Sequence, residues 1–396
     1  MLITLRKIRN DPEYRKVNHA INTALCLGSL GLAQVLKGTI VAAFPELLPL
    51  FFAVQCAGST LQGGFSDKYK RSIVLNISYI IIIVMLSSLM MIHSYEGWLF
   101  TILRGSCIIL IGLGGNADVV GRAEVIDMHY HLDRRKVMSW TVFSEAFSWI
   151  LVGAIIRFLN LDPFNILGLC IPFTALLLGI SLLFNTDKTE GREQIGSVFH
   201  EIKILIRNNK AKLSWITTIV ILGELGYFFF FYNQENHIRN SRILADSYIA
   251  WFLGMSLGSL ILSKLKKFSD LSLSIFGLGL SFVSIVIFIF GGMKSINDPQ
   301  MFYYDSFVYA LDGLGSGFYL PCFYSIISRG HSIHFQGMLT GWIDSLRVLG
   351  DATSNAILAG IGLMAFPKFV PIYVSGSLFI VTIFAIYLSK HKLNKN

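Results

Sequence analysis

Charged residues are scarce in this sequence. Asp, Glu, Lys and Arg make up 14% of the 396 residues, whereas 54% are hydrophobic and the mean hydropathy is +0.61. A soluble chain typically carries about 25% charged residues. The composition therefore excludes an ordinary soluble protein and predicts a chain that hides most of its surface in lipid. Its length leaves room for about a dozen membrane spans of ~20 residues joined by short loops.

Cysteine is also rare, and the motifs of several enzyme classes are missing. The five cysteines lie in apolar runs without paired spacing, and they are Cys26, Cys56, Cys107, Cys170 and Cys322. We interpret them as packing residues and expect neither a disulfide nor a metal site. The sequence has no phosphate-binding P-loop, no zinc motif and no nucleophile constellation. We therefore expect no cofactor, no ATP-driven transport and no enzymatic activity.

Basic residues outnumber acidic ones, and their distribution indicates topology. The net charge is +9, with 33 Lys and Arg against 24 Asp and Glu. Most of the basic residues fall in segments that would share one membrane face, among them 1–16 and 188–212. This positive-inside bias predicts an inner-membrane protein with both termini in the cytoplasm, and it argues against nucleic acid as a partner. Residues 1–16 do not resemble a cleavable signal peptide, because they are basic and contain no long apolar run.

Twelve apolar stretches are long enough to span a membrane. They lie at about 17–36, 45–65, 72–92, 98–120, 137–158, 164–184, 213–233, 243–263, 271–291, 303–327, 336–363 and 368–389. The longest polar stretch, 185–212, separates two sets of six. One helical face of its middle is apolar, which predicts an amphipathic helix on the inner membrane surface.

We therefore predict an all-α integral membrane protein with 12 transmembrane helices in two pseudo-symmetric six-helix bundles. The first bundle would cover residues 1–184, a cytoplasmic linker would cover 185–212, and the second bundle would cover 213–396. The halves repeat at an offset near 200 residues: LGSLGL at 27–32 matches LGELGY at 222–227. Three further matches keep an offset near 200, which supports a duplicated architecture. They are Gly58-Ser59 with Gly258-Ser259, Gly112-Leu113-Gly114 with Gly313-Leu314-Gly315, and Met138 and Trp140 with Met338 and Trp342.

The most informative tract is GSTLQGGFSDKYKR, between the second and third apolar stretches. A tract this polar must lie at a membrane face, because unpaired charge is costly in hydrocarbon. Its residues Gly63, Asp67, Lys68 and Arg71 resemble the loop signature of the major facilitator superfamily, roughly G-x-x-x-D-[RK]-x-G-[RK]-[RK], with Lys70 in place of the usual Gly. The resemblance implies a secondary transporter whose halves are related by a pseudo-twofold axis along the membrane normal.

The resemblance also implies that this loop latches one conformation by contacts with the fourth and eleventh spans. Asp118 and Arg122, near the inner end of the fourth span, are the expected partners of Asp67 and Arg71. In the second half the signature has decayed, because Lys267 stands at the position of Asp67. The alternative is a topological anchor with ordinary, individually weak surface ion pairs.

Seven further charged residues lie inside predicted spans. Burying a lone charge costs at least about 2.5–3.5 kcal/mol, so such residues must face a cavity or one another. They are Arg104, Glu145, Glu224, Asp312, Asp344, Arg347 and Asp351. They predict a pathway for substrate and proton between the halves, and the alternative is structural contact between helices.

The neighbours of two acids suggest a proton carrier. Glu145 and Glu224 both lie beside aromatic residues in the sequence. A carboxylate in a dry, apolar setting binds a proton near neutral pH, which is what a proton-coupled carrier needs. Either residue fits, and Glu145 ranks first because Phe and Trp flank it on both sides.

The arginines suggest where an anionic cargo would bind. Asp344 and Asp351 lie within a turn of Arg347 on one helix face, so we expect them to pair with it. Arg104 has no acidic neighbour on its own helix, and a guanidinium in a low dielectric grips a carboxylate well. We expect Arg104 to hold the anion, and a contact with an acid of another helix, Glu145 or Asp312, is the alternative.

These observations predict a monomeric, proton-coupled symporter of a small polar or anionic metabolite, such as a carboxylate-type siderophore, that works in the lipid bilayer by alternating access. A proton-driven multidrug or metabolite efflux pump is one alternative, although the fifth span lacks the G-x-x-x-G-P-x-x-G-G pattern of drug–proton antiporters. A non-transporting membrane sensor or scaffold is the other. Neutralising the buried acids would abolish transport by a carrier, whereas a scaffold would tolerate it.

Overall fold

The computed structural model describes residues 12–130, 132–159, 162–184, 203, 207, 214–226, 241–291, 299–329, 335–361 and 370–388. The amphipathic helix predicted within the linker 185–212 therefore lies outside the described residues, apart from two isolated positions.

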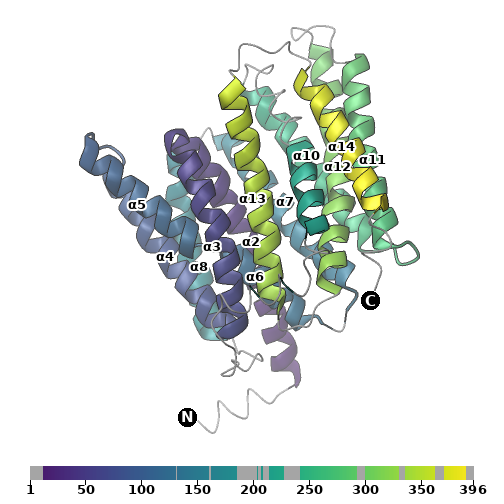
Figure 1. The fold of residues 1–396 in the computed structure, drawn as a ribbon. Coiled ribbons are helices and arrows are strands. Elements are labelled where there is room, and N and C mark those ends of the chain that lie inside the picture. The colour runs from purple at the N-terminus through teal and green to yellow at the C-terminus, as the bar shows by residue number, and fades with distance from the viewer. Residues whose placement is uncertain are drawn as a thin grey trace.

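The described elements are all helical (Figure 1). In chain order they are α2 (Pro12–Ala43), the 3-10 helix η1 (Pro45–Leu47), α3 (Leu48–Lys68), α4 (Arg71–Ile92), α5 (Trp98–Gly114), α6 (Ala117–Met128), α7 (Arg134–Leu159), α8 (Pro163–Phe184), a helix at 214–226, α10 (Ser241–Leu262), α11 (Asp270–Gly291), α12 (Pro299–Arg329), α13 (Gln336–Ile361) and α14 (Val370–Leu388). Each predicted span coincides with one of these helices, except that α5 and α6 share the fourth. The prediction of an all-α chain with twelve spans is thus confirmed.

The fourth span departs from its predicted end at residue 120. It continues as an apolar helical stretch to Met128, interrupted by a break between α5 and α6 at Gly115 and Asn116. The end predicted from hydropathy lies too early in the sequence, because α6 carries four charged residues. Their side chains are buried inside the protein, so they do not mark the membrane surface.

Side chains satisfy the backbone groups that this break releases. Gln62 of α3 donates a hydrogen bond to the carbonyl of Gly114, and Asn116 donates one to the carbonyl of Gly112 at 2.7 Å. The last carbonyls of a helix need such partners when they are buried. The break is therefore a stable feature, and it lets α6 present its charged residues to the centre of the protein.

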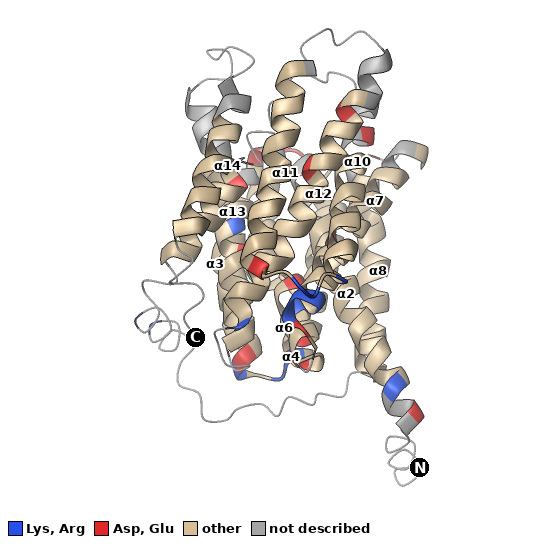
Figure 2. Ribbon diagram, turned by 90° about the vertical axis from the view of Figure 1, so that its right-hand side faces the viewer, with Lys and Arg blue, Asp and Glu red and all other residues tan. Residues whose placement is uncertain are grey.

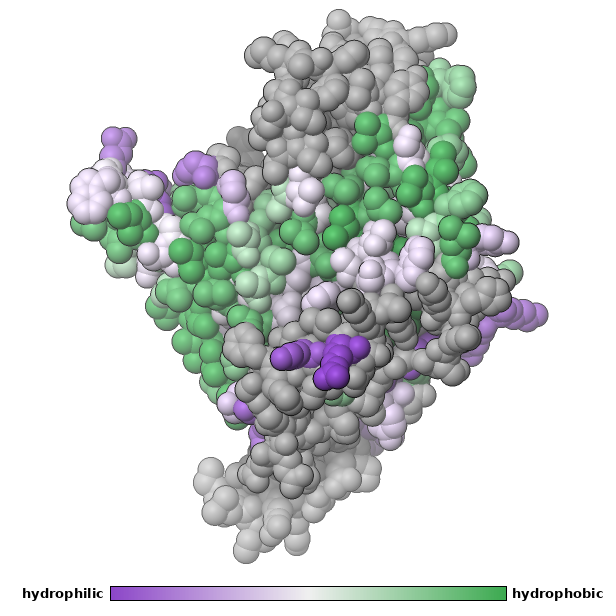
Figure 3. Space-filling view, in the orientation of Figure 1, coloured by the Kyte–Doolittle hydropathy of each residue, from purple (hydrophilic) through white to green (hydrophobic). Residues whose placement is uncertain are grey.

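Apolar side chains cover the flanks of the molecule, as Figure 3 shows for one face. On α4, the exposed large hydrophobic residues Ile73, Ile77, Ile80 and Val84 recur every three or four positions, so they form one helix face. Among the described residues, six helical stretches meet a strict test of length and hydropathy for crossing a membrane. They are Lys16–Ile40, Arg71–Ile92, Trp98–Met128, Arg134–Ile155, Phe164–Phe184 and Asp270–Phe290.

The helices pack in two groups that meet along two seams. In the first group α2 packs on α6 and α8, α3 on α5, and α4 on α5 and α8; in the second group α12 packs on α10 and α11, and α11 on α14. The two seams are formed by α3 with α13 and by α7 with α10, as Figure 1 shows for α3 and α13. The proposed limits of the two bundles place α7 in the first half and α13 in the second, so both seams would join the halves.

The seam between α3 and α13 is built from small residues. A Cβ atom on Gly63 would overlap the carbonyl oxygen of Gly337, and one on Gly341 would overlap that of Ser59. Further along, the hydroxyls of Thr60 and Ser345 are 2.7 Å apart. The two backbones can approach this closely only because glycine carries no side chain.

Candidate functional site

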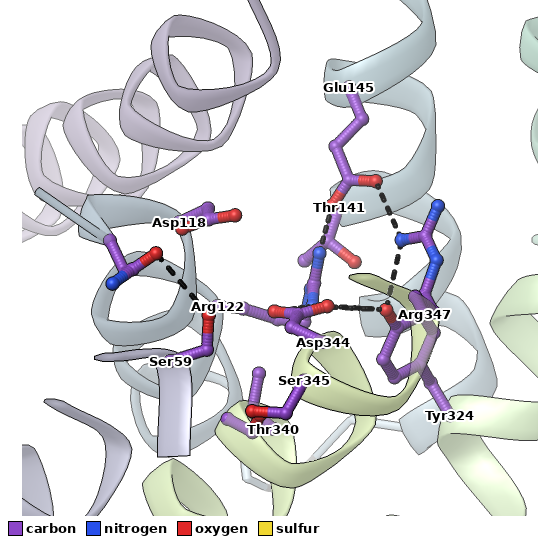
Figure 4. Close-up of polar contacts among 12 residues, drawn as sticks. Ser59, Asp118, Arg122, Thr141, Glu145, Tyr324, Thr340, Asp344, Ser345 and Arg347 are labelled. Atoms are coloured by element: carbon purple, nitrogen blue, oxygen red, sulfur yellow. Dashed lines mark hydrogen bonds and ion pairs between the residues drawn. The ribbon is translucent and has the colours of Figure 1, made fainter. Parts of the chain in front are cut away.

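A buried arginine lies at the centre of the molecule. Arg122 of α6 is fully buried, and its Nη1 donates to both carboxylate oxygens of Asp344 at 2.8 Å (Figure 4). Its Nη2 donates to Glu145 of α7, and its guanidinium lies 4.5 Å from the ring centre of Tyr324. A charge in this position is stable only because carboxylates and a phenol surround it.

A second arginine extends this network into the other half. Arg347 of α13 donates through Nε to Glu224 at 3.0 Å and through Nη1 to the hydroxyl of Tyr324 at 3.2 Å. Its Nη1 is also 3.8 Å from Glu145. The Tyr324 hydroxyl in turn donates to Asp344 at 2.8 Å. We refer to the six residues Arg122, Glu145, Glu224, Tyr324, Asp344 and Arg347 as the central network.

The central network joins the two halves and carries an imbalance of charge. Arg122 and Glu145 come from the first half, and the other four residues come from the second. The network has two guanidinium groups and three carboxylates, so one negative charge is left without a matching cation within it. Most of it is closed to solvent, but the Arg347 and Glu224 side chains keep exposed fractions of 22% and 11%.

Several predicted pairings within this region are wrong. Asp344 was expected to pair with Arg347 of its own helix, but it binds Arg122, whose Nη1 contacts both of its carboxylate oxygens across the interface. Glu145 was expected in an apolar setting, but its carboxylate faces both arginines of the network. Asp351 lies in α13, and its side chain is outside the described residues.

Arg104 is not part of the central network. It lies in α5, which packs on α3 and α4, and its Nε donates to the carbonyl of Phe100 at 3.4 Å. In the part of the chain that the structure describes, it forms no ion pair, so neither Glu145 nor Asp312 is its partner. The reason is its position near the start of α5, on the other side of the helix break from Arg122.

Two residues of this region were missed from the sequence. Lys37, just beyond the predicted end of the first span at residue 36, lies within α2 and binds the fully buried Asp118 at 2.8 Å. A lysine inside an apolar helix is a signal that could have been noticed, because such a residue needs a buried partner. Tyr324 gave no signal, since an apolar span rich in aromatic residues contains many such tyrosines.

A second set of contacts lies at the end of the bundle that carries Arg71, Arg135 and Arg329, which we call the basic end (Figure 2). There Asp67 accepts hydrogen bonds from the backbone N–H groups of Gly337 and Met338 at 2.9 and 2.8 Å. These are the first N–H groups of α13, where the helix dipole favours a negative charge. Asp67 also accepts from Arg71 at 3.1 Å.

The partners of this loop on the fourth span differ from the prediction. Arg71 binds Asp127 at 2.8 Å and lies 3.8 Å from Glu124, both near the end of α6. Asp118 and Arg122 were expected in this role, but they lie one to two turns deeper and bind elsewhere. The error follows from ending the fourth span too early.

The remaining residues of the loop signature play separate parts. Gly63 lies in the seam with α13, where its lack of a side chain allows backbone contact. Lys68 extends over the ring of Tyr69 at 5.7 Å, and among the described residues it forms no ion pair. The contacts of the loop therefore depend on Asp67, Arg71 and Gly63.

The second half carries a counterpart of this loop with the charges reversed. In the first half Arg71, at the start of α4, binds Asp127 at the end of α6. In the second half Asp270, at the start of α11, lies 3.2 Å from Arg329 at the end of α12. Lys267, which stands at the position of Asp67, is not in this contact, so the decayed position of the signature is separate from this ion pair.

Asp270 also reaches across to the first half. It lies 3.1 Å from Arg135 at the start of α7, and Arg329 lies 2.8 Å from Asp133. Together with the contact of Asp67 to α13, these ion pairs hold both halves together at the basic end. The structure therefore shows that end closed.

Replacing Asp67 by Asn is expected to loosen the basic end while leaving the fold intact. The substitution removes the charge-assisted hydrogen bonds to α13, which are worth about 1.5–3 kcal/mol. Labelling of a cysteine introduced at the buried Thr340 should then become about ten to a hundred times faster. The matched control is Lys70→Gln in the same loop, whose exposed side chain should leave the labelling rate unchanged. Equal rates in both variants would contradict a latch.

The geometry offers no metal centre in the residues that the structure describes: none of their His, Cys, Asp and Glu side chains gather in a group of three or more suited to a metal. The arrangement supports a different activity. Charges from two halves meet in the middle of a membrane-spanning bundle, and separate ion pairs close one end of it.

Comparison with known proteins supports this interpretation. The model of the Major Facilitator Superfamily matches residues 20–355. No curated protein matches the chain. The solved structure of the human organic anion transporter MFSD10 (TETRAN) resembles it with a TM-score of 0.71 and 14% identity, covering 95% of this chain and 100% of that one. A bacterial homologue of the iron transporter ferroportin, solved in an outward-facing state, has a TM-score of 0.67 and 13% identity, covering 94% and 99%.

Proposed function

The chain belongs to the major facilitator superfamily of secondary transporters, with twelve membrane-spanning helices in two six-helix bundles, and we propose that it carries a small polar or anionic metabolite together with a proton. The observation that carries this proposal is the central network. It joins the halves at mid-bundle, where a cargo must bind if the two halves rock around it.

The exposed part of the network is the expected cargo site. The side chain of Arg347 is 22% exposed and that of its nearly buried partner Glu224 is 11% exposed, whereas the side chains of Arg122, Glu145 and Asp344 are at most 4% exposed. A guanidinium can exchange one carboxylate for another, because both present two oxygens in the same geometry. When Glu224 takes up a proton, its hold on Arg347 weakens, and a carboxylate of the cargo can replace it.

This exchange also explains the direction of coupling. The network already contains one carboxylate more than it has guanidinium groups. A further anion is therefore disfavoured unless a proton arrives with it, since like charges in a low dielectric repel strongly. We propose proton-coupled symport of the anion for this reason. Organic acids, including carboxylate-type siderophores, are the cargo class that this site would accept.

The orientation of the protein is part of the same proposal. Basic loops favour the cytoplasmic side, so the basic end would face the cytoplasm and both termini would lie there. The closed basic end would then correspond to a state that opens outward. We propose an inner-membrane location, a monomer, and bundles at 1–184 and 213–396 joined by the linker 185–212.

A thermal-shift screen tests the cargo site. The purified protein in detergent would be heated with citrate and other organic acids, amino acids, sugars and lipophilic cations. A ligand that binds the folded state at 100 times its Kd stabilises it by about 2.7 kcal/mol. We expect organic acids to raise the melting temperature of the wild type and of Arg104→Gln, but not that of Arg347→Gln.

The Arg104→Gln variant is the matched control, because it removes an arginine from the same membrane region without touching the central network. Stabilisation by lipophilic cations instead of acids would favour an efflux pump. Anion binding that is lost in Arg104→Gln and kept in Arg347→Gln would reject the site proposed here and restore the role expected from the sequence.

A further inference from the structure

Asp312 is an acid that the central network does not use. It lies in the middle of α12 and is fully buried where that helix packs against α10 and α11. The packing is tight, because a Cβ atom on Gly313 would overlap the carbonyl oxygen of Trp251, and one on Gly315 would overlap that of Gly277. Asp312 therefore occupies a dry position that water can enter only when the packing of these helices changes.

The carboxyl group of Asp312 has few partners. Its Oδ2 accepts a hydrogen bond from the indole Nε1 of Trp251 at 2.7 Å, while its Oδ1 has no hydrogen-bond partner in the structure. Within the described residues no Lys, Arg or His forms an ion pair with it. The Ser281 hydroxyl of α11 is the other neutral donor close to this carboxyl group. An ionised carboxylate with only neutral donors beside it would be strongly disfavoured here, whereas a protonated carboxyl group suits the site.

The helices that surround Asp312 carry further charged residues. The charged groups described on the packed elements are Asp246 on α10, Asp270 on α11, Asp305 and Arg329 on α12, Arg134, Arg135, Lys136 and Glu145 on α7, Asp344 and Arg347 on α13, and Glu224 on the helix at 214–226. Arg135 and Arg329 bind acids at the basic end, Arg134 donates to the carbonyl of Ile126, and Lys136 lies over the ring of Trp140. Glu145 and Glu224 bind the arginines of the central network. None of these groups supplies a cation to Asp312.

Aromatic rings connect Asp312 to the other half. Trp251 packs edge-on against Phe252 with ring centres 4.7 Å apart. Phe252 stacks on Trp149 of α7 at 5.3 Å and with an angle of 7° between the rings. Trp149 fits against Gly38 of α2, where any side chain would overlap its ring. Trp251, the hydrogen-bond partner of Asp312, therefore contacts Phe252, and Phe252 is the ring of α10 that packs on α7 in the seam.

We propose that Asp312 binds a proton and that its charge state controls the aromatic contact between α10 and α7. Loss of the proton to an entering water leaves a carboxylate that needs more hydrogen-bond donors. Hydration of that group would displace Trp251 and, through it, Phe252 from Trp149, which weakens the seam. This site is distinct from the Arg347–Glu224 pair, and it rests on the proposed function only in requiring that the halves separate.

Infrared spectroscopy of the full-length protein in lipid membranes, without cargo, tests the proton. A protonated carboxyl group has a carbonyl stretch that is separate from the carboxylate bands. We expect this signal to diminish as the pH is raised for the wild type and for the control Asp305→Asn, which removes another acid of α12. The titrating signal should be absent from Asp312→Asn, whose amide oxygen can still accept the bond from Trp251. An unchanged titration in Asp312→Asn would overturn the proposal.

Two further variants test the link to the seam. Trp251→Phe removes the N–H donor but keeps an aromatic ring, so the carboxyl signal should persist to a pH about one to two units higher. Tryptophan fluorescence should change over the same pH range in the wild type. The change should vanish in Asp312→Asn, and in Trp149→Phe it should be smaller, because only Trp251 then reports it. A fluorescence change that survives in Asp312→Asn would overturn the link. Both readouts are independent of the anion screen, so failure of that screen would leave them unaffected.

Discussion

Replacing Arg122 by Gln is expected to destabilise the folded protein by about 3–5 kcal/mol, the largest effect that we predict for a single side chain. The substitution leaves Glu145 and Asp344 buried without their cation, and breaking a buried ion pair from one side has this cost. Gln is shorter and neutral, so it cannot restore the charged contact of Nη1 with both oxygens of Asp344. The melting temperature in detergent, compared with the wild type at the same pH, measures the loss.

The destabilisation should come mainly from Glu145 and Asp344, which remain buried without a cation, and not only from the loss of the contacts of Arg122. The triple variant Arg122→Gln, Glu145→Gln and Asp344→Asn removes the three charges together, and we expect it to recover a large part of the lost stability. Arg104→Gln is the control on the same span and should stay within about 0.5 kcal/mol of the wild type. A triple variant as unstable as the single one would show that Arg122 stabilises the protein by packing.

Replacing Gly63 by Ala is expected to force α3 and α13 apart at the basic end. The added Cβ would overlap the carbonyl oxygen of Gly337. This oxygen belongs to the backbone, so a change of side-chain rotamer cannot relieve the overlap. Inserting atoms into a closely packed contact typically costs about 1–3 kcal/mol. Because that cost falls only on the state with the basic end closed, the open state should gain about five- to a hundredfold in population.

The native Cys56 reports this change. It lies in the same seam, its carbonyl oxygen accepts a bond from Ser345, and it is half-buried while the other four cysteines are buried. A maleimide should therefore label Cys56 faster in Gly63→Ala than in the wild type. The control is Gly279→Ala, because no atom lies within 4 Å of a Cβ at that position. Equal labelling in the two variants would mean that the seam does not separate.

Much of the architecture could be predicted from the sequence, since the bilayer imposes it. Apolar stretches of membrane length located all twelve spans, and the repeat near 200 residues indicated two related halves. The same approach failed at the end of the fourth span. Hydropathy treats every charge as a mark of the membrane surface, whereas the charges of α6 are paired inside the protein.

The candidate site was predicted only in part. Burial cost singled out Glu145, Glu224, Asp344 and Arg347, which the structure brings together. It gave no means of choosing between Arg104 and Arg122 as the central arginine. The difference between them lies in the helix break, which separates α5 at the edge of the bundle from α6 at its centre.

The sequence by itself determined that this chain spans a membrane twelve times, that its halves repeat, and which deep charges needed partners. Those properties depend on composition and spacing along one chain. Only the tertiary structure decided which charge binds which, that the ion pair Asp270–Arg329 reverses the charges of Arg71–Asp127, and that Asp312 is not part of the central network. An ion pair needs two groups within about 4 Å, and the depth and rotation of helices that bring such groups together are set by packing between distant segments.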